Sequence, residues 1–427
     1  GFAKSDRPQR LFLLLDDAAG NSKVQRHARA EALAKDSGAR LLRQFDSLDA
    51  VVLEGDLKAL QRLLDSPAVL RIDSDPAGVG GLPQARLLAG IDPLFASGLD
   101  GLGTHIAVLD SGHDPLHPAF AGRISAELCF CSGNGCCPNG QASQTGSGAA
   151  SDDNGHGSNV SGLALGSGQA APRGVAPAAE LVSIKVLDRN NAFCCASDVV
   201  AGLDAVLSSH PEVDVVNLSL GTNATFASEC DGAAAWTQAM AQAVRGLRAR
   251  GTAVVAASLN GGNRSALPAP ACISGVLAVG AVWDADLGQR TFTQNDFSCT
   301  ETATRDRLTC FSNTSSQLDL VAPGAVLSAA GRGGGSSSYS GTSQASPMVA
   351  GCAALLRQAA PQATLAQIEA ALLASPVQID DAQSGRRYPR LDCSHALAQL
   401  AGGNGVNPDH IGSQFWLSGA GQVEGPA

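Results

Sequence analysis

The sequence has no apolar run long enough to cross a membrane and no cluster of basic residues. Its hydrophobic stretches all fall short of the roughly 18–20 residues that a membrane-spanning helix needs. The formal net charge is −10 and the arginines are scattered, which argues against nucleic acid as a partner. The chain opens on Gly1-Phe2-Ala3-Lys4, which lacks the pattern of a signal peptide and is typical of a processed or engineered start.

Cysteine is plentiful, but it does not occur with the spacing of a metal site. No Cys-x-x-Cys pair occurs and no histidine lies among the cysteines, which argues against zinc. Twelve cysteines, an even number that falls in clusters, instead indicate a disulfide framework in an extracellular chain. Their connectivity does not follow from the sequence alone. The positions are Cys129, Cys131, Cys136, Cys137, Cys194, Cys195, Cys230, Cys272, Cys299, Cys310, Cys352 and Cys393.

One segment combines a serine with the expected start of a helix. Residues 341–351 have the sequence Gly-Thr-Ser-Gln-Ala-Ser-Pro-Met-Val-Ala-Gly, and an apolar run over 349–356 follows the serine. The hydroxyl of Ser343 would lie at a helix N-terminus, where unpaired backbone N–H groups and the helix dipole favour developing negative charge. Serine is also a routine N-cap residue, so this segment alone leaves a structural and a nucleophilic role open.

Two upstream segments supply the base and the acid that a serine nucleophile needs. Residues 104–109 are apolar and β-branched, as in a buried parallel strand, and Asp110 follows at the carboxyl end, where open α/β sheets place ligand sites. Residues 153–162 place His156 between two glycines at the expected start of a second helix. Taken singly, the first segment is typical of a turn, and the histidine is typical of a surface or core residue.

The three segments occur in the order Asp, His, Ser, and together they resemble the motifs of the subtilisin-like serine peptidases, the subtilases. The resemblance extends from about Pro83 to about Leu400. It implies that Asp110 orients the imidazole, that His156 acts as general base and then acid, and that Ser343 is the nucleophile. It rests on residues 107–112 with His117-Pro118, on residues 155–158 with Val160 and Gly162, and on residues 341–343 with residues 345–347.

The resemblance also predicts an oxyanion hole. The apolar strand expected at residues 252–257 leads into Asn260, the position at which subtilases carry the side-chain donor. The backbone N–H of Ser343 is the expected second donor. Asn263 is a rival, but it comes three positions too late after the strand. An Asn-Gly pair is also a common turn former, so the assignment depends on the resemblance.

Substrate contacts are predicted on the neighbouring strand, expected over residues 213–218. Ser219, Leu220 and Gly221 match the subtilase edge that pairs with the substrate backbone, and without the resemblance they are an ordinary strand end. The primary specificity pocket should be apolar, since no carboxylate occurs among its expected lining residues. These are Leu220, Ala257, Leu259 and Ala266.

The chain departs from the subtilase pattern at three positions near the site. Leu259 replaces the glycine that usually precedes the oxyanion asparagine, which adds bulk to the pocket wall. Asn159 stands where a second histidine is common, and Gln344 stands where many subtilases carry methionine. Residues 163–174 also lack the asparagine-rich calcium loop that often follows the histidine helix. We therefore expect no required cofactor and no metal ligand in the site, and structural calcium is undecided.

Alternating strands and helices predict an α/β fold with a doubly wound, mostly parallel sheet over residues 83–401. Residues 181–187 are an expected strand, and residues 196–207 and 233–250 are expected helices. Residues 1–76 show a βαββαβ order and resemble the ferredoxin-like, inhibitor-type propeptide of subtilases, although an unrelated small α+β domain is the alternative. Residues 77–82 are the expected linker with a processing site, and residues 402–427 are a tail of unknown role.

The resemblance suggests several disulfide pairs. Cys299 should meet Cys310, Cys230 should meet Cys272, and Cys352 should meet Cys393. The four cysteines at 129–137 should include the partners of Cys194 and Cys195. The expected protein is thus a secreted, extracellular serine endopeptidase, or a periplasmic or cell-surface one. We expect it to be a monomer made as a zymogen, with protein or peptide substrates and its own N-terminal domain as inhibitor.

Three rival interpretations stay open. A catalytically dead subtilase fold would serve as a binding module, although the set of Asp110, His156, Ser343 and Asn260 argues against it. A purely structural, disulfide-rich protein would not need a histidine between glycines. Sedolisin-type carboxyl peptidases share the Gly-Thr-Ser turn but use a Glu/Asp pair and acid pH. Within the subtilase interpretation, His113 and His117 lack the glycine-flanked helix start and are not the predicted base.

Overall fold

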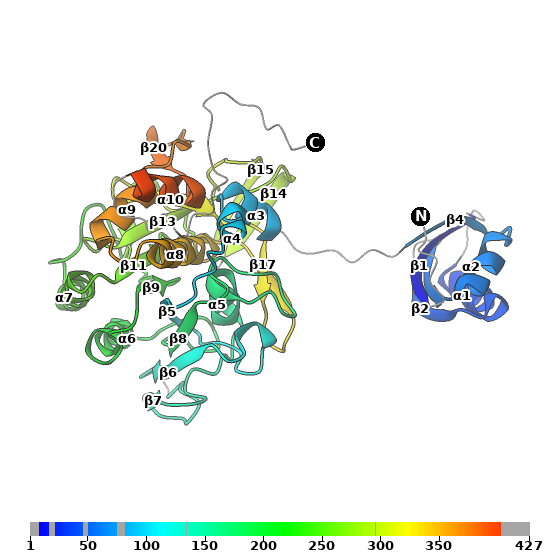
Figure 1. Cartoon of the computed structure of the whole chain (residues 1–427), viewed down its shortest axis with the longest axis horizontal. Helices are drawn as coiled ribbons and strands as arrows, with labels where there is room; N and C mark the ends of the chain where they lie inside the picture. The colour runs from blue at the N-terminus through cyan, green and yellow to red at the C-terminus, as the bar shows by residue number, and fades with distance from the viewer. Residues whose placement is uncertain are drawn as a thin grey trace. The chain divides into compact units, whose positions relative to one another are not determined.

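The computed structural model describes residues 8–16, 22–45, 50–74, 82–133, 135–294 and 296–402. The chain divides into two compact units, Gly1–Gly78 and Val79–Ala427 (Figure 1). The predicted tail at 402–427 and the predicted linker at 77–82 fall almost entirely outside the described residues. Within the described part of the chain, no helix combines the length and hydropathy of a membrane span.

The N-terminal unit has the predicted βαββαβ order. Its antiparallel sheet has the strand order β2-β3-β1-β4, which is the ferredoxin-like arrangement, and α1 and α2 pack on one face. Along β1, Leu11, Leu13 and Leu15 are buried against Leu33 of α1 and Leu63 of α2. The elements are β1 Gln9–Leu15, α1 Lys23–Ser37, β2 Arg40–Gln44, β3 Ala50–Gly55, α2 Leu57–Leu64 and β4 Val69–Ser74.

The second unit is built on an eight-stranded sheet with the order β16-β13-β11-β9-β5-β8-β6-β7. All neighbouring strands are parallel except β7, which pairs antiparallel with β6 at one edge. This is the predicted doubly wound, mostly parallel sheet. Its strands are β5 His105–Asp110, β6 Ile124–Phe130, β7 Ser143–Thr145, β8 Glu180–Lys185, β9 Val215–Leu218, β11 Ala253–Ala257, β13 Leu277–Val282 and β16 Leu320–Pro323.

Both faces of this sheet are covered by helices (Figure 1). Ile106 and Val108 of β5 pack with α5 and α8, whereas Ala107 and Leu109 pack on the opposite face with α6 and α7. The strands of a parallel sheet that is covered on both faces are mostly apolar, which explains the apolar run Ile106–Leu109 in β5. The helices are α3 Leu82–Leu88, α4 Asp92–Ala96, α5 His156–Leu165, α6 Ala196–Ser209, α7 Ala235–Ala249, α8 Thr342–Ala359, α9 Leu365–Leu373 and α10 Cys393–Gly402.

Several small strand pairs lie outside the elements that the sequence analysis expected. The Gly/Ser/Cys-rich region 132–151 contains β7, and the glycine-serine segment 331–338 contains the start of β18. β14 and β15 form a separate, mostly polar hairpin that the sequence analysis did not predict. The remaining elements are the 3-10 helix Pro118–Phe120 and the strands β10 Thr225–Phe226, β12 Leu267–Pro268, β14 Gly288–Gln294, β15 Phe297–Ala303, β17 Leu327–Ala330, β18 Ser336–Tyr339, β19 Gln378–Asp381 and β20 Arg386–Pro389.

Three of the expected disulfides are confirmed. Cys230 pairs with Cys272, Cys299 with Cys310, and Cys352 with Cys393. The last of these bonds ties α8 to α10, since Cys352 lies in α8 and Cys393 opens α10. The first and last bonds join cysteines 42 and 41 positions apart, and the second joins Cys299 in β15 to Cys310, 11 positions later.

The prediction for the other six cysteines is wrong. The bonds are Cys129–Cys137, Cys131–Cys136 and Cys194–Cys195, so no bond links the two segments. After β6 the chain turns back on itself, and this brings the Cα atoms of the first two pairs to 5.8 and 5.4 Å, within disulfide range. The segments do touch, because the hydroxyl oxygen of Ser132 lies 3.5 Å from the sulfur of Cys194.

Candidate active site

The predicted site residues meet at the carboxyl edge of three adjacent strands. Asp110 is the last residue of β5, Ser219 follows β9, and Asn260 lies in the loop after β11. Two helices begin at the same edge, with His156 as the first residue of α5 and Ser343 as the second residue of α8. Carboxyl edges of parallel strands are where α/β sheets bind ligands, so this edge is the candidate active site.

Asp110 and His156 are in direct contact. Nδ1 of His156 lies 2.8 Å from Oδ1 of Asp110. The same carboxylate oxygen accepts the backbone N–H of Ser111 at 2.7 Å. Asp110 is fully buried and only 9% of His156 is exposed. A carboxylate on Nδ1 fixes that nitrogen as the N–H donor, which leaves Nε2 as the basic nitrogen of the neutral ring.

Electrostatics at His156 favour the protonated ring. Burial lowers the pKa of His156, but the charge of Asp110, the hydrogen bond to Asp110 and the charge of Asp152 outweigh burial, so the pKa is raised above its ordinary value of 6.5. A raised pKa makes the imidazole a stronger base. The ring is thus suited to accept a proton at neutral to alkaline pH.

Glycine is needed on each side of His156, for a different structural reason at each position. Gly155, the N-cap of α5, has a φ of 111°, a conformation that glycine adopts without steric cost. Gly157 lies against the turn after β5, where a Cβ atom would collide with the carbonyl oxygen of Gly112. Together they let α5 begin close enough to β5 for the imidazole to reach Asp110.

Ser343 lies in the first turn of α8 and belongs to a buried network of hydrogen bonds. Its carbonyl oxygen accepts the hydroxyl of Ser219 at 2.9 Å, and its own hydroxyl donates to the carbonyl oxygen of Ser219 at 3.3 Å. Asn217 continues the network by donating to Ser219 and accepting the hydroxyl of Ser346. Among the described residues, Ser343 makes no hydrogen bond with His156, and such contacts often tighten only when substrate binds.

Asn260 is held in place by hydrogen bonds to its amide oxygen. Its Oδ1 accepts both the backbone N–H and the hydroxyl of Thr342, at 2.8 and 3.0 Å. An amide oxygen that is fixed in this way leaves Nδ2 as the group available to an acceptor. Nδ2 donates to Oε1 of Gln294 at 3.1 Å.

The loop that carries Asn260 is fixed from behind by Asn313. Oδ1 of Asn313 accepts the backbone N–H groups of Gly261 and Asn263, at 3.0 and 2.9 Å, and its Nδ2 donates to the carbonyl oxygen of Ser258 at 2.8 Å. A single buried side chain thus satisfies three backbone groups of the loop. Such a loop can keep a donor in place before a reaction begins, which is what electrostatic catalysis requires.

The residues expected to line the primary pocket are apolar and mostly buried. Leu220, Ala257 and Ala266 are 4%, 0% and 8% exposed. Leu259 packs over Gly221, where a Cβ atom would come within 2.9 Å of its side chain. Leu259 also has a φ of 66°, a left-handed conformation that glycine adopts without cost. The leucine therefore fills space beside Gly221 at some steric cost.

Two of the residues that depart from the subtilase pattern, Gln344 and Asn159, are hydrogen-bonded to each other. Nε2 of Gln344, the residue after Ser343, donates to Oδ1 of Asn159 in α5 at 3.3 Å. Nδ2 of Asn159 in turn donates to the backbone and the hydroxyl of Ser337. The two replacements are thus one hydrogen-bonded pair between the helices that carry His156 and Ser343.

Sequence reasoning missed the buried charged residues that join the end of β5 to the segment before α5. Nζ of Lys185, a fully buried lysine in β8, donates to the carbonyl oxygen of Ser111 at 3.0 Å and to the carboxylate of Asp153 at 2.6 Å. A lysine within the strand expected over residues 181–187 was the available signal. Lys185 connects the end of β5 with the segment that leads into α5.

Asp152 makes a second connection. It accepts the hydroxyl of Ser111, the backbone N–H groups of Asn154 and Gly155, and both the N–H and the hydroxyl of Ser158. Burial raises the pKa of Asp152, but these hydrogen bonds outweigh it, so the pKa is lowered and the carboxylate stays charged. The negative charge lies at the N-terminus of α5, where the helix dipole stabilises it.

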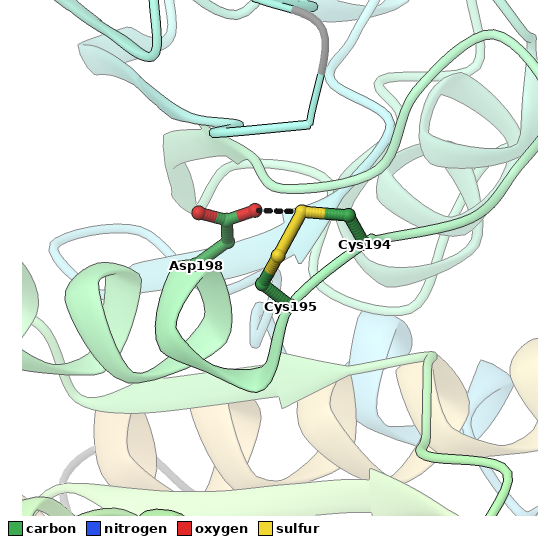
Figure 2. A group of neighbouring side chains, drawn as sticks. All are labelled: Cys194, Cys195 and Asp198. Carbon is green, nitrogen blue, oxygen red and sulfur yellow. Dashed lines mark hydrogen bonds between the residues drawn. A yellow bond between two sulfur atoms is a disulfide. The ribbon is translucent and has the colours of Figure 1, made fainter.

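One group of side chains in the described part of the chain brings three possible metal ligands together. Cys194, Cys195 and Asp198 place their ligand atoms within 4.8 Å of one another (Figure 2). The two sulfurs are joined in a disulfide, so they supply no thiolate, and a single carboxylate does not make the oxygen-rich cage that Ca²⁺ prefers. This group does not fit a metal ion.

Comparison with known proteins identifies the family. The sequence model of the subtilase family matches residues 101–391. The chain belongs to the subtilase family. The matched range includes every residue of the candidate site, from Asp110 to Ser343. The protein is therefore a subtilisin-like serine endopeptidase.

Individual relatives support the same conclusion. The chain is 31% identical over 369 residues to an extracellular serine proteinase of Thermus sp. (strain Rt41A), which covers 83% of this chain and 77% of the relative. It is 28% identical to subtilisin E of Bacillus subtilis (strain 168) over 80% of this chain and 79% of that one. A crystal structure of a cold-adapted subtilisin-like serine proteinase covers 69% of this chain and 90% of its own, with 26% identity and a TM-score of 0.52.

The raised pKa of His156 gives a test by pH. An imidazole accepts a proton only when it is neutral, so kcat/KM for peptide hydrolysis should rise with pH through a midpoint above 6.5 and then level off. Asp110→Asn should move that midpoint to lower pH, because the charge that raises the pKa is gone, and should lower kcat by about four orders of magnitude. A pH profile that peaks in acid, or a midpoint that Asp110→Asn leaves in place, would contradict base chemistry at His156.

Proposed function

We propose that this subtilase hydrolyses peptide bonds through an acyl-enzyme, with Asp110, His156 and Ser343 as its catalytic triad. The observation that carries this assignment is the 2.8 Å contact between the buried carboxylate of Asp110 and Nδ1 of His156. It leaves Nε2 as the basic nitrogen at the same strand edge as the Ser343 hydroxyl. The matched family model and the order Asp, His, Ser along the chain support the assignment.

The proposed reaction uses each group in turn. His156 takes the proton of the Ser343 hydroxyl as its oxygen attacks the scissile carbonyl carbon, and Asp110 stabilises the imidazolium that forms. The imidazolium then gives its proton to the leaving amine, the C–N bond breaks, and an acyl-Ser343 ester remains. Water, deprotonated by His156, hydrolyses the ester and restores the enzyme. No step requires a cofactor.

Asn260 is the proposed side-chain donor to the oxyanion. Its Oδ1 accepts two hydrogen bonds from Thr342, the residue before the nucleophile, so that Nδ2 is the donor group beside the start of α8. The backbone N–H of Ser343, one of the unpaired N–H groups of the first helical turn, is the proposed second donor. A loop that Asn313 fixes can hold the first donor in place before charge develops.

The proposed substrate is an extended polypeptide with an apolar residue before the scissile bond. Its backbone would pair with Ser219, Leu220 and Gly221 beyond β9, as an added strand pairs with a sheet edge. The apolar lining supports a preference for uncharged side chains. An extracellular location is proposed on two grounds, namely the six disulfides and the relative that is named an extracellular serine proteinase.

Substitution of the nucleophile and of the oxyanion donor should have separable effects. Ser343→Ala should lower the rate of peptide hydrolysis by about six orders of magnitude and leave the thermal unfolding midpoint close to that of the wild type. Asn260→Ala should lower kcat by about a hundredfold or more with little change in KM, because the donor acts on the transition state. Steady-state kinetics on one peptide substrate measure both, and near wild-type turnover by Ser343→Ala would reject the triad.

The pocket geometry predicts the preferred side chain. Leu259 narrows the pocket beside Gly221, so a peptide library should show Leu or Met ahead of Trp, and all of them ahead of Arg. Leu259→Gly should shift the profile towards Phe and Trp, and the fold should tolerate the change because the left-handed φ suits glycine. A wild-type profile that peaks at Arg would refute the apolar pocket, and an unchanged Leu259→Gly profile would remove Leu259 from its wall.

We also propose that residues 1–76 act as an intramolecular inhibitor and folding aid, so that the protein is made as a zymogen. The ferredoxin-like strand order of the N-terminal unit supports this. Self-processing is expected within residues 76–82, with slow release of the cleaved part. Mass spectrometry of freshly folded protein should show cleavage in the wild type and none in Ser343→Ala. An uncut, fully active wild type would make these residues a permanent accessory domain.

A further inference from the structure

The β14–β15 hairpin places an exposed glutamine beside the loop that carries Asn260. This loop, residues 258–263, is called the oxyanion loop below. Gln294 is the last residue of β14, and its Oε1 accepts Nδ2 of Asn260 at 3.1 Å. The two residues are 34 positions apart in the chain, so the contact depends on where the hairpin is fixed. The subtilase motifs do not include Gln294.

Several contacts anchor the hairpin to the loop that carries Asn260. The Cys299–Cys310 disulfide ties β15 to the residue before Phe311, and the backbone carbonyl of Phe311 accepts the N–H of Gly262 at 2.8 Å. The Phe311 ring packs against Phe292 of β14, with ring centroids 4.2 Å apart. Oε1 of Glu301 in β15 accepts the backbone N–H of Cys310 at 2.6 Å. These contacts fix the position of the hairpin relative to the loop that carries Asn260.

The hairpin also lies directly against the oxyanion loop. Phe297, which pairs with Gln294 in the hairpin, packs so closely on Gly262 that a Cβ atom there would come within 2.8 Å of the ring. Gly262 follows Asn260 by two residues. The position of Gln294 relative to Asn260 is therefore set by packing as well as by the disulfide.

The hydrogen bonds of the Asn260 amide leave one donor for a substrate. Thr342 occupies Oδ1 with two hydrogen bonds, and Nδ2 carries two hydrogens, of which Gln294 accepts one. The remaining hydrogen is the one that an oxyanion would accept. We propose that Gln294 is a positioning residue, which holds the Asn260 amide in its donor orientation for the transition state. This role rests on the proposed function of Asn260.

A double-mutant cycle tests the proposal. Gln294→Met keeps the length of the side chain but removes the acceptor, and it should lower kcat about three- to tenfold with KM unchanged, the loss expected for one hydrogen bond. In the Asn260→Ala background the same change should have no further effect. Gln289→Met is the matched control, since Gln289 is an exposed glutamine in the same strand, and it should leave kcat unchanged.

A charged variant sharpens the test. Gln294→Glu retains an acceptor but places a negative charge beside the developing oxyanion, so kcat should fall below that of Gln294→Met. Three results would overturn the role of Gln294: an unchanged kcat in Gln294→Met, an equal loss in the Asn260→Ala background, or a rise in kcat/KM, which would mean that Gln294 blocks the site.

The same measurements distinguish failure of the proposed catalytic triad from failure of the proposed role of Gln294. Wild type and Ser343→Ala are measured in the same series, and absence of Ser343-dependent hydrolysis contradicts the triad itself. If the wild type is active but Gln294→Met lowers kcat equally with and without Asn260, only the role of Gln294 is contradicted.

Discussion

The hydrogen bond between Asp110 and His156 is the interaction on which the rest of the site depends. A buried carboxylate at the end of a parallel strand is costly without donors, and Oδ1 of Asp110 accepts from His156 at 2.8 Å and from the backbone N–H of Ser111 at 2.7 Å. The contact requires α5 to start against the turn after β5, which only a residue without a side chain permits at Gly157. The tautomer and orientation of the imidazole follow from this contact, and Asp110 also makes the largest contribution that raises its pKa.

A frame of buried polar groups holds that contact and the oxyanion loop in place. Lys185 and Asp152 join the end of β5 to the segment before α5, so one hydrogen-bond network holds the segments that carry Asp110 and His156. Asn313 holds the loop of Asn260, and the hairpin with Gln294 lies on its other side. Buried polar networks whose members are satisfied give a rigid arrangement. The site is therefore organised before a substrate arrives, as electrostatic catalysis requires.

The sequence predicted those features whose signal lies within one segment. The apolar run of β5 followed by Asp110, and the glycine-led helix starts at His156 and Ser343, each depend on local chemistry, and the structure brings them together. The partners of Cys194 and Cys195 were predicted wrongly, because pairing depends on how the chain reverses after β6. Gln294 was missed since its strand is polar and exposed and buries too little apolar surface to give a pattern. Lys185 gave a signal, but its partners come from separate segments.

The most direct test of the account is active-site labelling with a fluorophosphonate, read out by mass spectrometry of the digested protein. A triad that is assembled as described makes Ser343 the single modified residue, because only an activated serine hydroxyl attacks the phosphorus. The adduct should be lost when His156 is replaced by Ala, since the hydroxyl then lacks its base. An unlabelled Ser343 in folded, processed protein, or an adduct that forms equally well without His156, would contradict the claim that these three segments form a working catalytic centre.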